Sequence, residues 1–461
     1  MRHPGMASIG RWAARLAVGV ALVILASCGG GDNPAAPGFT SIPANPAIPA
    51  APTYTVGGIV SNLQVAGLTV TLTVSGTSTS FAVPPNINTF TFTTALPDST
   101  TYSAVISNQP PGFTQQCSIT NGTGTIASAS VNNVLVLCRQ AAGLVSTIAG
   151  TNANGYLDGT GTVAQFNYPH GLAVDAAGVM YVSDQGNSAM RKVAPNGVVS
   201  TLAGSPTTSG FANGTGTAAL FSSQMGQAAV DVAGNIYVSD NGNNMIRKIT
   251  PAGVVSTVVG STTSGFADGP AASATLNFPH GVAVDGAGNV YVGDSCNNAV
   301  RKVTPGGTVT TLAANVTGST CGGVYGLAVD AGGNVYVADR GENKILKITA
   351  AGVVSTLAGT GASGSGDGTA TLATFSQPRS VAVDAFGNVF VADGGNNLIR
   401  KINPAGFVST LAGGSTGGGF ADGDGLSQAL MAQPWGIATD AAGNVYFADE
   451  YNFRVRKIVP H

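Results

Sequence analysis

One sequence unit recurs six times along the C-terminal two thirds of the chain, and it constrains the fold more than any other feature. Its first copy reads GLAVDAAGVMYVSDQGNSAMRKV, starting at Gly171. Every copy holds two Asp residues nine positions apart. Successive copies are spaced by 56, 54, 45, 54 and 56 residues, counted between their first Asp residues: Asp175, Asp231, Asp285, Asp330, Asp384 and Asp440. A repeat of this length predicts a fold built from stacked or radially arranged units.

Each unit contains four short β-forming runs, of the types GLAVD, NVYVSD, IRKI and VVSTLAG. Four strands at a period near fifty residues are typical of one blade of a β-propeller, so six units predict six blades. The sixth unit is followed by no fourth run, but GLVSTIAG at residues 143–150 precedes the first unit. We expect this segment to complete the last blade, because an open ring would leave strand edges unpaired.

The composition agrees with an all-β chain. Of 461 residues, 66 are Gly and only 9% are charged, against about 25% in an average soluble protein. Glu, a strong helix former, occurs twice, as Glu342 and Glu450. The net charge of −2 argues against a nucleic-acid partner, which would need a basic face.

The six units resemble the NHL-repeat family of β-propellers. The resemblance rests on the paired Asp residues, the basic pair such as Arg191-Lys192, and the following GVVSTLAG run, and it extends over residues 143–461. It implies a six-bladed propeller over residues 141–461. It implies little about function, because the fold is shared by binding scaffolds and unrelated enzymes.

The N-terminus has the features of an export signal. Arg2, Arg11 and Arg15 precede an apolar run of about ten residues, which is too short to span a bilayer but fits a signal peptide at residues 1–27. The run ends in Leu-Ala-Ser before Cys28, which resembles the lipobox of bacterial lipoproteins. The resemblance implies a lipid-anchored envelope protein, and Gly29 after the Cys favours the outer membrane. Ordinary secretion with an incidental Cys28 is the alternative.

Two further regions separate the signal from the repeats. Residues 28–53 are rich in Gly, Pro and Ala and suit a semi-extended tether. Residues 54–140 contain about seven alternating β-like runs separated by turn residues, which predicts a small β-sandwich. The region resembles accessory modules of bacterial surface lipoproteins, for which we expect a spacer role.

The five cysteines suit an oxidising compartment. Lipidation would use Cys28, and Cys117 with Cys138 would link two sandwich strands. Cys296 and Cys321 lie in loops of neighbouring repeats that should emerge on one face, so we expect a second disulfide. Two free buried thiols are the alternative.

Residues that recur in every copy serve the blade itself. We therefore assign the second Asp of each unit to a turn that bonds its own backbone, and the basic pairs to charged outer strands. Asp also recurs in the loops between blades, where a turn is favoured over a calcium site because each loop offers few carboxylates. These loop residues are Asp158, Asp268, Asp367 and Asp422, with Asn213 in one copy.

One position varies among the copies, five residues before the first Asp. In a propeller it lies where the innermost strand enters the central channel, so the six residues should ring one mouth: His170, Gly226, His280, Tyr325, Arg379 and Trp435. After signal removal Trp435 is the only Trp, and two of three His residues are in this ring. Such groups at a concave mouth suit a ligand site, while the alternative is that they pack the rim.

Two classes of function are compatible with this ring. The first is a non-catalytic propeller on the cell envelope that binds a protein, peptide or glycan. The second is a hydrolase or lyase resembling propeller lactonases or amidating lyases, which hold a metal in the channel. Two His residues leave a zinc site short of ligands, and neither Glu342 nor Glu450 is expected in the channel. We therefore favour binding, by a monomer without catalytic residues, metal or cofactor.

Overall fold

The computed structural model describes residues 50–61, 63, 66–109, 115–139, 143–414 and 418–460. These ranges contain β-strands and short 3-10 turns, and no α-helix. The predicted signal peptide, Cys28 and nearly all of the tether lie outside the described residues. No helix within the described ranges has the length and apolar character needed to cross a membrane.

The N-terminal β-region forms the predicted sandwich of two antiparallel-rich sheets. One sheet has the order β5-β2-β10-β8 and the other β4-β3-β7-β9, while β1 and β6 form a separate pair. The strands are β1 (Thr53–Tyr54), β2 (Val56–Ser61), β3 (Thr69–Val74), β4 (Thr77–Ala82), β5 (Thr89–Thr91), β6 (Leu96–Pro97), β7 (Thr101–Asn108), β8 (Gln116–Thr120), β9 (Thr123–Thr125) and β10 (Val131–Arg139).

Alternating side chains of both sheets fill the sandwich core, including Val70, Phe90 and Val136. The predicted disulfide joins Cys117 of β8 to Cys138 of β10, which are directly opposite each other in the ladder. The bond therefore fastens two neighbouring strands of one sheet. Burial of both cysteines places it within the apolar core.

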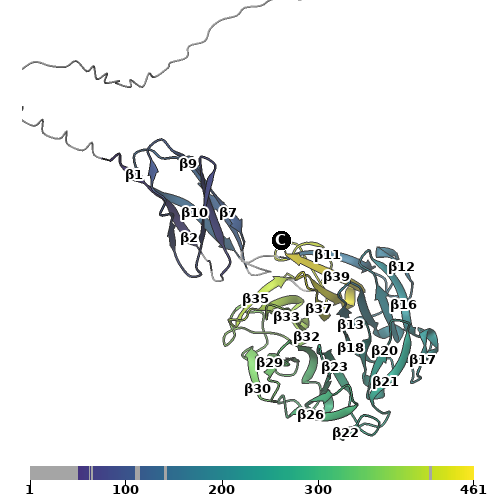
Figure 1. Ribbon diagram of the computed structural model, residues 1–461. Helices are drawn as coiled ribbons and strands as arrows, with labels where there is room; N and C mark the ends of the chain where they lie inside the picture. Colours follow the sequence, from purple (N-terminus) through teal and green to yellow (C-terminus); the bar gives the residue numbers. More distant parts are fainter. Residues whose placement is uncertain are drawn as a thin grey trace, which may run out of the picture. The chain divides into compact units, whose positions relative to one another are not determined.

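The repeats form six radially arranged sheets (Figure 1). The innermost strands are β13 (Pro169–Val174), β18 (Met225–Val230), β23 (Pro279–Val284), β27 (Val324–Val329), β32 (Pro378–Val383) and β37 (Pro434–Thr439). The second strands, which end at the second Asp, are β14 (Met180–Asp184), β19 (Ile236–Asp240), β24 (Val290–Asp294), β28 (Val335–Asp339), β33 (Val389–Asp393) and β38 (Val445–Asp449).

The third and fourth strands follow in antiparallel order. The third strands are β15 (Ala189–Val193), β20 (Met245–Ile249), β25 (Ala299–Val303), β29 (Lys344–Ile348), β34 (Leu398–Ile402) and β39 (Arg454–Pro460). The fourth are β16 (Val198–Gly204), β21 (Val254–Gly260), β26 (Thr308–Ala314), β30 (Val354–Ala358), β35 (Phe407–Ala412) and β11 (Gly143–Gly150).

Strand β11 belongs to the last blade although it precedes the first repeat in the chain. It pairs antiparallel with β39, with Val145 opposite Ile458. The sheet β36-β11-β39-β38-β37 thus combines strands from both ends of the repeat region. This arrangement leaves no missing fourth strand in the ring of blades.

Five blades carry a fifth, two-residue strand that the sequence pattern did not reveal. It comes from the loop that leads into the blade and pairs with the fourth strand. These strands are β12 (Gly159–Thr160), β17 (Gly214–Thr215), β22 (Gly269–Pro270), β31 (Gly368–Thr369) and β36 (Gly423–Asp424). Among the described sheets, blade four (β27-β28-β29-β30) has four strands.

A buried arginine organises each of those five blades. In blade one, Arg191 is fully buried and donates from Nη1 to Asp184, at 2.7 Å, and from Nη2 to Asp158, at 2.6 Å. Asp184 also accepts a hydrogen bond from the backbone N–H of Asn167, in the loop ahead of the innermost strand. The guanidinium and Asp184 therefore join the second and third strands to two points of the loop that leads into the blade. Arg247, Arg301, Arg400 and Arg456 occupy the same position.

This Asp–Arg–Asp cluster corrects two expectations from the sequence. The arginine of each basic pair is buried rather than placed along an outer strand, and only the lysine beside it is at least partly accessible in four of the five blades. In five blades the second Asp bonds the arginine, a distant loop and the Asn side chain of its own turn, rather than the backbone of that turn. The first Asp instead makes a turn that bonds its own backbone: Asp175 accepts from the backbone N–H groups of Ala177 and Val179.

The cluster predicts that substitutions of two adjacent cationic residues differ strongly in their effect on the free energy of unfolding. Arg247→Met removes the partner of the fully buried Asp240 and should lower the free energy of unfolding by about 3–5 kcal/mol. Lys248→Met, at the neighbouring and partly exposed position, should change it by under about 1 kcal/mol. Chemical denaturation of both variants measures the two values. Equal effects would show that the buried ion pair stabilises the fold no more than the partly exposed lysine does.

Candidate functional site

The six divergent residues are each the second residue of an innermost strand, next to a break in the strand register. In β13 the pairing with β14 shifts between Pro169 and Leu172, and all six innermost strands have a corresponding shift. A bulge of this kind re-aims a side chain relative to the sheet. The residue directly after the ring position is often Gly, because a Cβ at Gly171 or Gly281 would collide with backbone of the next blade. Neighbouring innermost strands thus approach closely around the channel.

Four aromatic and imidazole rings of this set contact one another. The ring centroids of His170 and Trp435 are 3.8 Å apart, and those of His280 and Tyr325 are 3.6 Å apart. The two His rings are separated by 5.3 Å and join the two pairs. Both His side chains are almost fully buried, so the rings form a packed floor at the mouth. Rim packing and a ligand site, which the sequence left as alternatives, are therefore both compatible with this cluster.

Two arginines lie over this floor. The guanidinium carbon of Arg379 is 4.0 Å from the centroid of Trp435, and that of Arg340 is 5.1 Å from the centroid of Tyr325. Arg379 is 6% exposed and donates a long hydrogen bond to Gln433. Space for it exists because residue 394 is Gly, where a Cβ would contact the Arg379 side chain. The face of an aromatic ring attracts a cation, so Trp435 and Tyr325 help to hold the two guanidinium groups in place.

The structure also places Glu450 at this mouth, which the sequence reasoning did not expect. Glu450 is 6% exposed and lines the same pocket as His170, Arg379 and Trp435. It directly follows the second Asp of its blade, where the 3-10 turn η7 (Glu450–Asn452) begins. The position is a second divergent one, and comparing the six copies there could have found it: Gln185, Asn241, Ser295, Arg340, Gly394 and Glu450.

The mouth forms a pocket of about 390 Å³ lined by both divergent sets. Gly226 is the one ring position without a side chain, and Asn241 of the same blade fills part of that space. Several buried polar atoms among the lining residues have no hydrogen-bond partner: His170 Nδ1, Asn241 Oδ1, Arg340 Nε, Arg379 Nε and Glu450 Oε2. Buried polar groups are normally paired, so this concentration marks a place where a bound molecule would complete the bonding.

Burial sets the protonation of the pocket. It lowers the pKa of His170 well below the usual value, with His280 and Arg379 adding to the effect. It also lowers the pKa of His280 to about 3, so both imidazoles are neutral at neutral pH. Burial raises the pKa of Glu450 to about 7, although the nearby positive charge of Arg379 opposes the shift. The pocket therefore combines two arginines with a carboxyl group that titrates near neutrality.

Residues just ahead of the innermost strands adopt a left-handed backbone. Tyr168, Phe278, Gln377 and Gln433 have positive φ values between 46° and 54°, although none is Gly. Backbone strain of this type persists only where surrounding contacts enforce it. Asn side chains of the preceding blade supply such contacts: Asn244 accepts from the Phe278 N–H, and Asn397 from the Gln433 N–H. The entry to the channel is thus held by bonds between blades.

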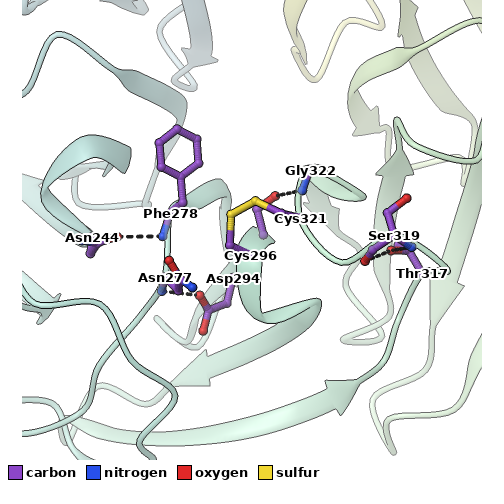
Figure 2. Close-up of a disulfide and its surroundings, with 10 residues drawn as sticks. Asn244, Asn277, Phe278, Asp294, Cys296, Thr317, Ser319, Cys321 and Gly322 are labelled. Carbon is purple, nitrogen blue, oxygen red and sulfur yellow. Dashed lines mark hydrogen bonds between the residues drawn. A yellow bond between two sulfur atoms is a disulfide. The ribbon is translucent and has the colours of Figure 1, made fainter.

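The second disulfide fixes a loop beside this face (Figure 2). Cys296 of the turn η5 (Ser295–Asn297) is bonded to Cys321, in the loop that leads into blade four. The backbone N–H of Gly322 also donates to Ser295 Oγ at 3.2 Å. Both predicted disulfides are therefore present. In the described part of the chain, no three His, Cys, Asp or Glu side chains are grouped closely enough to hold a metal ion.

Comparison with known proteins identifies the type of propeller. Residues 276–303 match the family model of the NHL repeat. Blade three therefore carries an NHL repeat. No curated protein matches the chain.

Solved structures share the fold of this chain at low sequence identity. A protein of unknown function from Bacteroides thetaiotaomicron is 20% identical, with a TM-score of 0.57, over 90% of this chain and 99% of that one. An auxiliary nutrient binding protein from Bacteroides ovatus is 18% identical, with a TM-score of 0.54, over 90% and 100%. Another from Bacteroides thetaiotaomicron is 17% identical, with a TM-score of 0.55, over 89% and 98%. These similarities show the fold.

Glu450 should make the stability of the propeller depend on pH. Its pKa is about 7 in the folded chain and 4.5 ordinarily, so between these values the folded state binds more protons and stability falls as pH rises. Glu450→Gln should be more stable than the parent near pH 8, by up to about 3 kcal/mol, and the difference should vanish near pH 4.5.

Denaturation at both pH values measures the effect, with Gln433→Ala as an uncharged control in the same pocket. The stability difference for that control should not depend on pH. A Glu450→Gln difference that stays constant with pH would contradict the assigned titration.

Proposed function

We propose that this protein is a non-catalytic NHL propeller that binds a protein, peptide or glycan at the channel mouth and adjacent loops. One observation carries the proposal: the mouth pocket collects buried polar atoms without partners, from His170, Asn241, Arg379 and Glu450. The names of two of the solved neighbours, auxiliary nutrient binding proteins, support a binding role.

The lining suits a ligand with both polar and flat surfaces. Trp435 and Tyr325 are partly exposed, so the parts of their rings that Arg379 and Arg340 leave uncovered can contact a ligand. Arg340 and Arg379 supply cationic donors for an acidic or carbonyl group, and the Glu450 carboxyl supplies an acceptor or, when protonated, a donor. Asn241 and Gln433 add neutral amides. We assign His170, His280, Tyr325, Arg379 and Trp435 to this site, together with Arg340, Asn241 and Glu450.

A metal-dependent hydrolase or lyase is the second candidate, and the position of Glu450 is the observation that favours it. This carboxyl group lines the same pocket as two neutral imidazoles, which are ligand types that zinc takes, although the three groups are not close enough together in this structure to hold an ion. Metal analysis of the purified protein separates the two functions. Stoichiometric zinc or calcium that is lost in Glu450→Gln would support the enzyme and oppose the binding proposal.

We further propose that the protein acts at the cell envelope as a monomer, exported and anchored through lipid on Cys28, with the outer membrane as its site. The disulfides are typical of proteins that mature in an oxidising compartment. The sandwich and the tether would then hold the propeller away from the membrane surface. Affinity capture from envelope extracts would search for the ligand.

Ligand binding should change the fluorescence of Trp435, the only Trp after signal removal. The indole lies in the mouth, so a bound molecule alters its surroundings and its emission. Arg379→Ala and His280→Ala should weaken binding at least about tenfold, equivalent to about 1.4 kcal/mol. Lys192→Ala, at a position that does not line the pocket, serves as the control.

Fluorescence titration with a captured ligand measures these affinities, and far-UV circular dichroism checks that each variant is folded. A ligand that binds both variants with the affinity of the parent would place the site elsewhere.

Anchoring should depend on a single atom, the sulfur of Cys28. Cys28→Ser removes the acceptor for the acyl chain, and a protein without stable lipid anchoring should move to the soluble fraction. Fractionation of cells that express the parent and the variant measures the distribution. Membrane association that is unchanged in Cys28→Ser would contradict lipidation.

A further inference from the structure

Blade four lacks the buried cation that the other blades contain. In blade one, Oδ2 of Asp184 accepts two hydrogen bonds, from the Asn187 side chain, three residues later, and from Arg191, seven residues later. Blades two, three, five and six repeat both bonds, at Asp240, Asp294, Asp393 and Asp449. The same carboxylate oxygen thus holds an amide and a guanidinium in each of five blades.

In blade four both donors are replaced. The residue three positions after Asp339 is Glu342, and the residue seven positions after it is Leu346. The ladder confirms that these positions correspond, because Leu346 pairs with Val337 as Arg191 pairs with Val182. The loop that supplies Asp158 in blade one is also shorter in blade four, and its two-residue strand is absent from the described sheet.

Asp339 is therefore buried without the Asn and Arg donors that the other blades supply. The residue is 1% exposed, and its Oδ2 has no hydrogen-bond partner, while Oδ1 accepts from the Glu342 backbone N–H at 3.1 Å. Burial raises the pKa of Asp339 to about 6, so the carboxyl group is mostly charged at neutral pH. The nearby ammonium of Lys344 pairs with Glu342, at 2.9 Å. A buried charge in this state normally requires a partner.

The missing groups leave a cavity of about 190 Å³. Asp339, Glu342, Lys344 and Leu346 line it, together with Thr317 and other residues of the adjoining strand and loop. The side chains of Glu342 and Lys344 are 36% and 28% exposed, so the cavity adjoins the surface. A molecule can reach it from solvent by displacing this exposed pair.

We propose that this cavity binds a guanidinium group supplied from outside the blade, in place of the arginine that the other blades provide themselves. The five other blades show that a carboxylate at this point of the strand holds a guanidinium between β-strand and loop. A guanidinium also supplies the several planar donors that two carboxylates can accept together. A calcium ion would need about six oxygen ligands, and the cavity offers two carboxylates.

The first test compares methylguanidinium with urea, its neutral analogue, at millimolar concentration on the full chain. A ligand that binds the folded state raises the melting temperature as its concentration increases. Methylguanidinium should therefore raise the melting temperature to a plateau, whereas urea should not. If methylguanidinium behaves as urea does, the proposal is wrong.

Variants then locate the effect. Leu346→Arg restores the arginine found in the other blades and should raise the melting temperature by itself while it abolishes the response to methylguanidinium. Leu346→Met, which adds no charge, is the matched control and should retain the response. Asp339→Asn removes the charge without changing the shape and should also lose the response. If methylguanidinium stabilises Leu346→Arg and the parent equally, it binds elsewhere and the proposal fails.

A further comparison distinguishes two possible sources of the guanidinium group. Free arginine and N-acetylarginine amide carry the same side chain, but only the second imitates an arginine within a polypeptide. Equal responses to both support the arginine of a partner protein as the natural occupant. A response to free arginine that is at least tenfold more sensitive supports a small molecule. A response to neither would contradict the proposal.

Discussion

The geometry of the propeller depends on a buried Asp–Arg pair that also bonds a half-exposed loop residue, which is Asp in four blades and Asn213 in blade two. In each of five blades one guanidinium joins strands two and three to the loop from the preceding blade, and the same carboxylate holds the loop ahead of the innermost strand. In blade one the bonded residue of that loop is Asn167, and the mouth residue His170 follows three positions later. The interaction that stabilises a blade therefore also positions its contribution to the pocket.

The mouth and the cavity of blade four show two different ways in which a repeat acquires specific chemistry. At the mouth, two positions per blade change freely because they form no part of the cluster, and together they bring arginines, imidazoles and Glu450 into one pocket. In blade four the cluster itself has changed, so that Asp339 remains while its donors are lost. The disulfide between Cys296 and Cys321 fastens the loop that the cluster no longer holds.

The electrostatic properties of the mouth follow from its burial. The packed rings exclude water from His170 and His280, which keeps the imidazoles neutral, and the same exclusion raises the pKa of Glu450 to about 7. The guanidinium groups of Arg340 and Arg379 lie against aromatic faces. A ligand that enters would replace missing hydrogen bonds rather than compete with existing ones, because several polar atoms there lack partners.

The sequence by itself determined the six blades, the two disulfides and the ring of His170, His280, Tyr325, Arg379 and Trp435, because repetition makes strand order and equivalent positions visible. It did not show that the repeated arginines are buried, since burial depends on a loop about 33 residues away in the chain that closes over them. It also missed Glu450, whose place beside the channel depends on how the turn after the second strand folds toward the axis. Only the tertiary structure decided which charges meet, because those contacts join blades and loops that no local pattern relates.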